Sequence, residues 1–218
     1  AARSFFAAAS FAAASFFAAA AATLAAAAAS FAVSLSDAAL AFAASLSSIF
    51  FSLTAFFHIG NITFLADVYF RGIENCATPT RWVEYTLTAS IMSTIIAYLS
   101  GLRDEASLIA VAALVGTTML FGGLVELVAR PVSEGAWRDA ISVRSLPHFM
   151  GYVPYIFAWL LILYSFFESG GACAAPKFVY TIIIGQFVLF SAFIFPQLYQ
   201  LHRPPRDFYR GEIGFITL

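Results

Sequence analysis

The stretch RWVEYTLTASIM, Arg81 to Met92, decides the fold class. It opens a long apolar segment with an arginine and a carboxylate three residues apart, so Arg81 and Glu84 take neighbouring positions on one helix face. A charge such as Glu84 inside a membrane span is costly and marks a function. The stretch therefore predicts a transmembrane helix with a functional acid rather than a plain anchor.

The composition agrees with a membrane protein whose main partner is the lipid bilayer. Hydrophobic residues make up 61% of the chain and charged residues only 11%, whereas soluble domains carry about 25% charged residues. The net charge of -1 and the absence of a basic block give no sign of a nucleic-acid partner. A water-soluble fold of 218 residues could not hide this much apolar surface.

Residues 1–46 have a biased composition. The run SFFAAASFAAASFFAAA from Ser4 to Ala20 holds only Ser, Phe and Ala, and the alanine bias lasts to about Ala44. Two interpretations are open: an Ala/Ser-rich targeting peptide, or placeholder residues standing for side chains that were not identified. We favour the second, so we take only the presence of helices from 1–46 and no chemistry.

Hydropathy divides the chain into segments of the length that a membrane span needs, about 20 apolar residues. The six predicted helices are Phe5–Ser30, Ala38–Phe64, Trp82–Leu102, Ala106–Ala129, Leu146–Phe167 and Phe178–Leu201, and Ile213–Leu218 begins a seventh. Short loops predict that successive helices are antiparallel neighbours in one bundle. The expected fold is all-α, a single transmembrane helical domain over residues 1–218.

The basic residues predict the orientation. With the amino terminus on side one, nine of the eleven basic residues fall on that side and two, Arg103 and Lys177, on the other. The positive-inside rule then places the amino terminus on the cytoplasmic or equivalent side. Cys76 and Cys173 fall on opposite sides in this topology, so we expect no disulfide between them.

Several motifs, in order along Ser52 to Leu218, resemble the heliorhodopsins, seven-helix retinal proteins with inverted membrane orientation. Arg81, Trp82, Glu84 and Tyr85 match the third-helix motif of that family, and Ser90 and Met92 follow in pattern. Further stretches are similar to its later helices, namely Leu120–Val128, Gly151–Trp159, Phe178–Gln200 and Phe208–Leu218. His58 stands where the family has a second-helix histidine.

The resemblance implies a rhodopsin-like bundle that binds retinal as a Schiff base on a seventh-helix lysine. The only lysine here, Lys177, begins the sixth predicted helix and is not in that place. The family's lysine would fall beyond Leu218, about one and a half helical turns on. The sequence ends at Leu218, before that position.

The charged candidates each have a functional and a structural interpretation. Glu84 is either the counterion of a protonated Schiff base or half of a structural pair with Arg81. Arg81 either tunes that acid or is an interfacial arginine. His58 either lines a polar cavity near Glu84 or is a hydrogen-bonded packing residue. For Glu126 and His148, near predicted helix ends, we favour an interfacial, solvated position.

An apolar slot for retinal is expected among aromatic side chains and a methionine. The candidates that the resemblance adds to Glu84, Arg81 and His58 are Tyr85, Ser90, Met92, Tyr155, Phe187, Phe190 and Phe193. The alternative is that these residues only pack the bundle or contact lipid. Pro154 and Pro196 should kink their helices, and Gly122 and Gly123 allow close helix approach or room for a ring.

Two function classes remain open. The first is a heliorhodopsin-like light sensor, which is doubtful as an ion pump because the third predicted helix carries no second carboxylate after Glu84. The second is a retinal-free structural or accessory subunit of a large multi-subunit membrane complex. No catalytic triad, P-loop or metal-ligand cluster appears in the sequence, so we expect no enzyme and no metal site. The resemblance suggests a homodimer.

Overall fold

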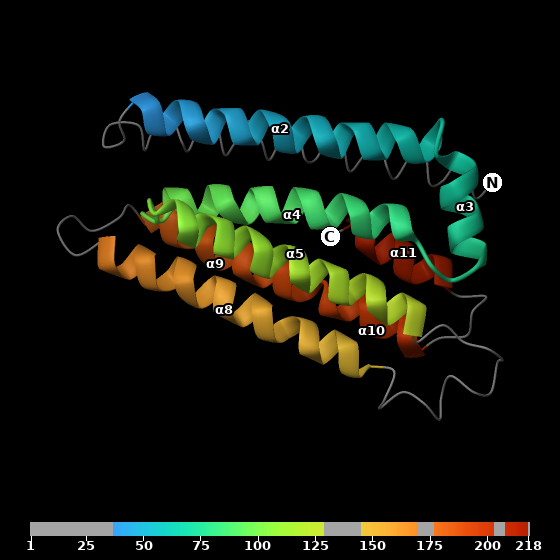
Figure 1. Cartoon of the computed structure of the whole chain (residues 1–218). Helices are drawn as coiled ribbons and strands as arrows, with labels where there is room; N and C mark the ends of the chain where they lie inside the picture. Colours follow the sequence, from blue (N-terminus) through green and yellow to red (C-terminus); the bar gives the residue numbers. More distant parts are fainter. Residues whose placement is uncertain (1–36, 129–144, 170–176, 203–207, 218) are drawn as a thin grey trace.

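The computed structural model describes residues 37–128, 145–169, 177–202 and 208–217, and every regular element in these ranges is an α-helix (Figure 1). The helices are α2 (Asp37–Ile62), α3 (Ala66–Glu74), α4 (Pro79–Leu99), α5 (Glu105–Val128), α8 (Leu146–Ser169), α9 (Lys177–Ala192), α10 (Ile194–His202) and α11 (Phe208–Thr217). The all-α helix bundle predicted from hydropathy is confirmed. The first predicted helix, Phe5–Ser30, lies outside the described residues, as does most of the biased segment 1–46.

The long helices lie side by side in one bundle (Figure 1). Helix α4 packs between α2 and α5, and α5 packs in turn on α8. Helix α10 packs against α11, which lies close to the first turns of α4 through the polar contacts described below. This arrangement places the RWVEY stretch at the centre of the bundle rather than at its edge.

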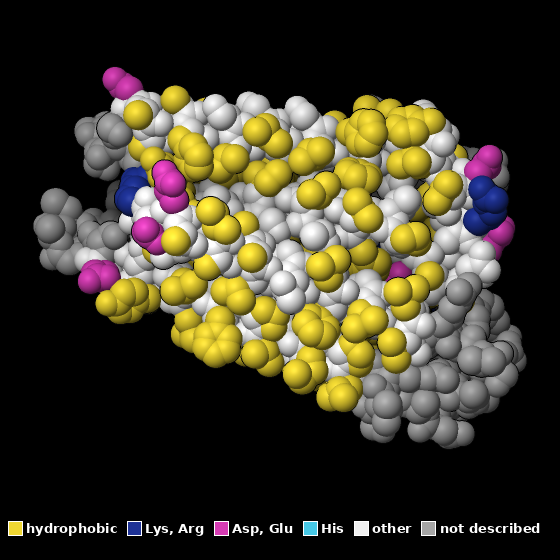
Figure 2. All heavy atoms as spheres, viewed as in Figure 1, with side chains coloured by type: hydrophobic (Ala, Val, Ile, Leu, Met, Phe, Trp, Pro, Cys, Tyr) yellow, Lys and Arg dark blue, Asp and Glu magenta, His cyan; other side chains and the backbone are white. Residues whose placement is uncertain are grey.

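Four of the described helices are long and apolar enough to cross a membrane. The spans are Asp37–Ile62, Glu105–Val128, Leu146–Glu168 and Tyr180–Leu201. Figure 2 shows hydrophobic side chains along the length of the bundle, whereas the charged side chains gather at its two ends. Because lipid rather than water covers such a surface, exposed residues such as Phe56, Ile109 and Leu160 are expected there. The protein is an integral, multi-pass membrane protein.

Helix α4 is not among these four spans, although it was predicted as one. Its sequence mixes apolar residues with Arg81, Glu84, Thr88 and Ser93, and all four of these polar side chains are buried in the bundle. Neighbouring helices cover α4, and Arg81 and Glu84 pair with side chains of those helices, which is how charged residues are tolerated at membrane depth.

The sixth predicted helix is two helices in the structure. Helix α9 ends at Ala192 and α10 begins at Ile194, so the predicted span is present over Tyr180–Leu201 but its helix is interrupted rather than continuous. Pro196 explains the break, because a proline has no N–H for the carbonyl four residues earlier and its ring collides with that carbonyl. Pro154, by contrast, lies inside a continuous α8.

The short helix α3 and the turn after it were not predicted. Cys76 adopts a positive φ of 55°, and the backbone N–H of Ala77 donates to the carbonyl of Gly72 at 2.9 Å. A Cβ atom on Gly72 would lie 2.6 Å from the carbonyl oxygen of Ala77, so only glycine fits here. This tight turn delivers the chain directly to the start of α4 and fixes where Arg81 lies.

Candidate functional site

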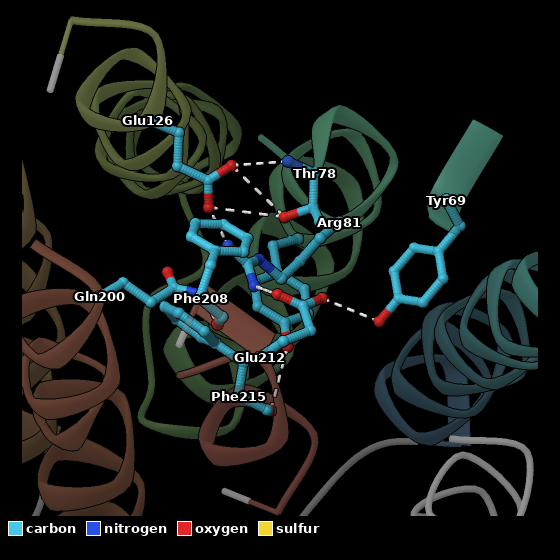
Figure 3. Close-up of polar contacts among 9 residues, drawn as sticks. Tyr69, Thr78, Arg81, Glu126, Gln200, Phe208, Glu212 and Phe215 are labelled. Atoms are coloured by element: carbon cyan, nitrogen blue, oxygen red, sulfur yellow. Dashed lines mark hydrogen bonds and ion pairs between the residues drawn. The ribbon is translucent and has the colours of Figure 1, made fainter. Parts of the chain in front are cut away.

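A buried ion cluster surrounds Arg81 at the beginning of α4 (Figure 3). The guanidinium pairs with the carboxylates of Glu126 from α5 and Glu212 from α11. Arg81, Glu126 and Glu212 are 4%, 6% and 1% exposed. Buried charges persist only when they are paired and hydrogen-bonded, so this cluster holds three helices in one arrangement.

Further hydrogen bonds complete the cluster. The phenol of Tyr69 on α3 donates to Glu212 Oε1 at 2.8 Å. The backbone N–H of Thr78, which Pro79 follows at the start of α4, donates to Glu126 Oε2 at 2.8 Å. The guanidinium also lies over the ring of Phe215, 4.0 Å from its centroid. Residues of four helices and one turn therefore meet at Arg81.

Two expectations from the sequence are wrong here. Arg81 does not pair with Glu84, because its guanidinium reaches across to α5 and α11 instead of along its own helix. Glu126 is not solvated at an interface but is buried against Arg81 and Thr78. The sequence did contain a sign that Glu126 is buried, because it lies in a strongly apolar segment and acids inside such segments are rarely without a partner.

Glu84 has a different partner, on α2. His58 Nδ1 lies 3.0 Å from Glu84 Oε1, and the carboxylate is almost fully buried. Three residues separate Glu84 from Arg81 along α4, yet the two side chains belong to separate polar clusters. The structure thus leaves Glu84 with an imidazole and no guanidinium beside it.

An apolar slot lies between α4, α5, α8, α9, α10 and α11, with a cavity volume of about 50 Å³. Its lining is mostly aromatic and includes Tyr85, Tyr152, Tyr155, Phe190, Phe193 and Phe215. The hydroxyl of Tyr85 donates to the carbonyl of Phe215 at 3.2 Å, and that of Tyr155 lies 2.8 Å from Ser191 Oγ. These bonds turn the polar ends of both tyrosines away from the apolar space.

The structure brings some of the predicted retinal contacts together and not others. Tyr85, Tyr155, Phe190 and Phe193 line the slot. Glu84, Arg81 and His58 belong to the polar clusters described above and are not among the lining residues, and three further candidates do not line the slot either. Phe187 stacks on the ring of Tyr155 and is 39% exposed, Ser90 donates to the carbonyl of Ala112 at 3.0 Å, and Met92 packs against the core around Trp159 and Ile162.

Among the slot residues that sequence reasoning missed are Trp82, His148 and Gln197. His148 was expected to be solvated but is 7% exposed and lies edge-on to Tyr152. The indole of Trp82 packs directly on Gly122 and Gly123, so the ring for which these glycines make room is a tryptophan. The available signal was spacing, because Trp82 and Tyr85 share a helix face three residues apart.

The chain was compared with known proteins. No curated protein matches it at a significant level. The heliorhodopsin family matches over residues 5–218. This range includes α2 with His58, α4 with Glu84, and the helices that form the slot. The chain therefore belongs to the heliorhodopsin family, a family of retinal-binding, light-sensing membrane proteins.

Proposed function

We propose that this protein is a light sensor that binds retinal through a lysine beyond Leu218, with Glu84 as the counterion. The observation that carries the proposal is the burial of Glu84 together with the identity of its partner. Glu84 is 4% exposed, lies within the helix bundle, and its ion-pairing partner among the described residues is the imidazole of His58. A buried carboxylate without a permanent cation is suited to stabilise a positive charge on a ligand.

The residues of the chain fit retinal. The slot is apolar and aromatic, as ligand sites within helix bundles commonly are. Its volume of about 50 Å³ accommodates one end of a long apolar molecule rather than the whole. When bound, retinal supplies light absorption and a change of shape on isomerisation. Tyr85, Tyr155, Phe190 and Phe193 would then hold its apolar body.

The polar residues of the site would have different roles. Glu84 would stabilise the positive charge of the ligand, and His58 would orient the carboxylate and hold or release a proton at its imidazole. Arg81 is already paired with Glu126 and Glu212, so its guanidinium does not also form an ion pair with Glu84. Light-driven displacement in the slot would act on Tyr85, whose hydroxyl bonds to the backbone of α11.

Sensing is favoured over ion pumping. Beyond Glu84, helix α4 carries no other carboxylate, and its buried polar residues are Thr88 and Ser93. The other buried acids near the slot, Glu126 and Glu212, are paired with Arg81. A relay along α4 would need further titratable groups at hydrogen-bonding distance, and past Glu84 the described part of that helix offers no carboxylate or histidine.

The lysine is expected on the continuation of α11. Along this helix Glu212 meets Arg81 and the carbonyl of Phe215 meets Tyr85, so α11 and α4 run in the same direction at this level. Residues that follow on α11 would face successive turns of α4 beyond Tyr85. A side chain on a helix leans toward the amino-terminal end, which would direct a lysine there back toward Glu84.

Two measurements test the proposal. Sequencing of the full-length gene product shows whether a lysine stands about one and a half turns after Leu218. Hydroxylamine treatment of the purified protein shows whether a visible band bleaches, as a Schiff base requires. Another residue at that position, or no pigment after retinal is added, would refute the proposal and favour a retinal-free structural subunit.

A further inference from the structure

Three buried polar atoms of residues that line the slot have no hydrogen-bond partner among the described residues. They are the indole Nε1 of Trp82, Nε2 of His148 and Oε1 of Gln197. They come from α4, α8 and α10, and all three residues line the same cavity. Buried polar groups in folded proteins are almost always paired, so three unpaired atoms around one space indicate that something binds there.

Packing, rather than mutual bonding, holds these side chains in place. Gln197 is 2% exposed and His148 is 7% exposed, and the imidazole lies 5.3 Å from the ring of Tyr152 in an edge-to-face contact. The six-membered ring of Trp82 occupies the position that a side chain on Gly122 would take. None of these contacts satisfies the three polar atoms.

The three atoms define the chemistry of the guest. An indole N–H can only donate a hydrogen bond, an amide oxygen can only accept one, and an imidazole Nε2 can do either. The bound molecule must therefore both accept and donate hydrogen bonds. Apart from the imidazole of His148, no acidic or basic side chain is among the residues that line the slot, so nothing there favours an ion. A hydroxyl oxygen meets all of these requirements.

The size of the cavity agrees with this chemistry. A space of about 50 Å³ is sufficient for a water molecule or for the hydroxylated end of a larger apolar molecule. We propose that a hydroxyl oxygen binds between Trp82, His148 and Gln197. It belongs either to a bound water or to a hydroxyl group on the ring of a retinoid, and only this second source rests on the function proposed above.

Nuclear magnetic resonance of the full-length, pigment-free protein in lipid nanodiscs tests the water source. The probe is magnetisation transfer from water to the indole N–H groups, with the Trp82 signal assigned by Trp82→Phe. Trp159, which is 2% exposed and lies in the apolar core, is the internal comparison. We expect magnetisation transfer from water to the indole N–H of Trp82 to be several-fold stronger than to that of Trp159. We expect Gln197→Leu to abolish the transfer to Trp82.

Loading with retinal or with ring-hydroxylated retinal tests the ligand source. If the ligand supplies the hydroxyl, the hydroxylated pigment resists hydroxylamine for several-fold longer, and Gln197→Leu removes the difference. If water supplies it, the two pigments bleach at equal rates and transfer from water to Trp82 persists. Either result supports the hydroxyl site. No transfer in the pigment-free protein together with equal bleaching would overturn it.

An independent test is whether replacing Gln197 with methionine lowers or raises the melting temperature. If a hydroxyl satisfies Gln197, then Gln197→Met removes a hydrogen bond and lowers the melting temperature relative to Gln186→Met, a half-buried glutamine on α9 outside the slot. If Gln197 is truly unpaired, the same change removes a buried polar group and raises the melting temperature, which would overturn the proposal. Should Gln197→Met not fold, the resonance measurement on the unmodified protein still decides.

Discussion

His58 Nδ1 lies 3.0 Å from Glu84 Oε1 and joins α2 to α4 inside the bundle. The same nitrogen lies 3.0 Å from the backbone carbonyl of Thr54. A carbonyl oxygen and an ionised carboxylate both only accept, so the hydrogen of a neutral imidazole is on Nδ1. Helix α2 therefore contributes a fixed donor to Glu84, and α4 contributes the negative charge on which the proposed pigment depends.

Replacing Glu84 with glutamine tests its role as counterion. Loss of the carboxylate removes the attraction that keeps a positively charged chromophore protonated. The visible band of Glu84→Gln should absorb further to the red, and it should convert to the ultraviolet-absorbing, deprotonated form at a pH lower by more than about one unit. A spectrophotometric pH titration measures both changes. An unchanged titration midpoint would mean that another group is the counterion.

Replacing Arg81 tests the ion cluster. Arg81→Met leaves Glu126 and Glu212 buried without their cation, and breaking a buried pair costs about 3–5 kcal/mol. We expect a large fall in the melting temperature in detergent. The matched control adds Glu126→Gln and Glu212→Gln, which removes the uncompensated charges and should recover most of the loss. If Arg81→Met alone melts like the unmodified protein, the cluster does not stabilise this fold.

The fit of Trp82 against α5 can be tested with two glycines. A Cβ atom on Gly122 would lie 2.1 Å from Cζ3 of Trp82, whereas one on Gly185 in α9 meets nothing within 4 Å. Gly122→Ala should force the indole aside and cost about 1–3 kcal/mol. Gly185→Ala should be neutral or stabilising, because alanine favours a helix by up to about 1 kcal/mol over glycine. Equal melting temperatures for the two variants would contradict the packing.

The fold was largely predictable because long apolar segments in the sequence identify the membrane spans. The regions of α2, α5 and α8 were each identified to within a few residues. The miss at α9 and α10 arose because hydropathy continues through Pro196 while the helical hydrogen bonding does not. Helix α3 was missed because nine residues are too few to stand out beside a long apolar segment.

The site was less predictable than the fold. Glu84, Arg81 and His58 were singled out correctly as buried or half-buried polar groups, but their partners come from residues 26 to 131 positions away. Sequence spacing reveals neighbours on one helix and says nothing about which faces of two helices meet. The pairing of Arg81 with Glu212 depends on how α11 packs against α4, which no local pattern encodes.

Outside the membrane spans, Asp104 caps the start of α5. Its carboxylate accepts hydrogen bonds from the side chain of Ser107 at 2.7 Å and from the backbone N–H of Ser107 at 2.8 Å. These bonds lower the pKa of Asp104. A lowered pKa means that the stabilisation is present above the ordinary pKa of aspartate and disappears as the pH falls through the folded value.

The test compares Asp104→Ala with the unmodified protein in thermal melts from neutral to acid pH. The unmodified protein should have the higher melting temperature at neutral pH, and the gap should close in acid because the protonated carboxyl is a poorer acceptor. Asp67, which is exposed in the first turn of α3, provides the control substitution at another helix start. A gap that stays constant with pH would show that the charge of Asp104 does not contribute.

The orientation in the membrane follows from charge and can be tested directly. Nine of eleven basic residues fall on the side of the predicted amino terminus, and this asymmetry predicts that this side faces the cytoplasm or its equivalent. The loop containing Arg138 and the loop containing Arg103 should then face opposite compartments. Single cysteines can be introduced in each loop of a variant in which Cys76 and Cys173 are serine.

In sealed right-side-out vesicles, a membrane-impermeant maleimide should label the cysteine at position 103 and leave that at position 138 unlabelled until the vesicles are opened. The two positions control for each other, since a leaky preparation labels both. Labelling at position 138 alone before the vesicles are opened would show that the orientation is the reverse of the predicted one. It would also place the cluster around Arg81 near the outer surface, because α4 begins on the same side as the Arg138 loop in the predicted topology.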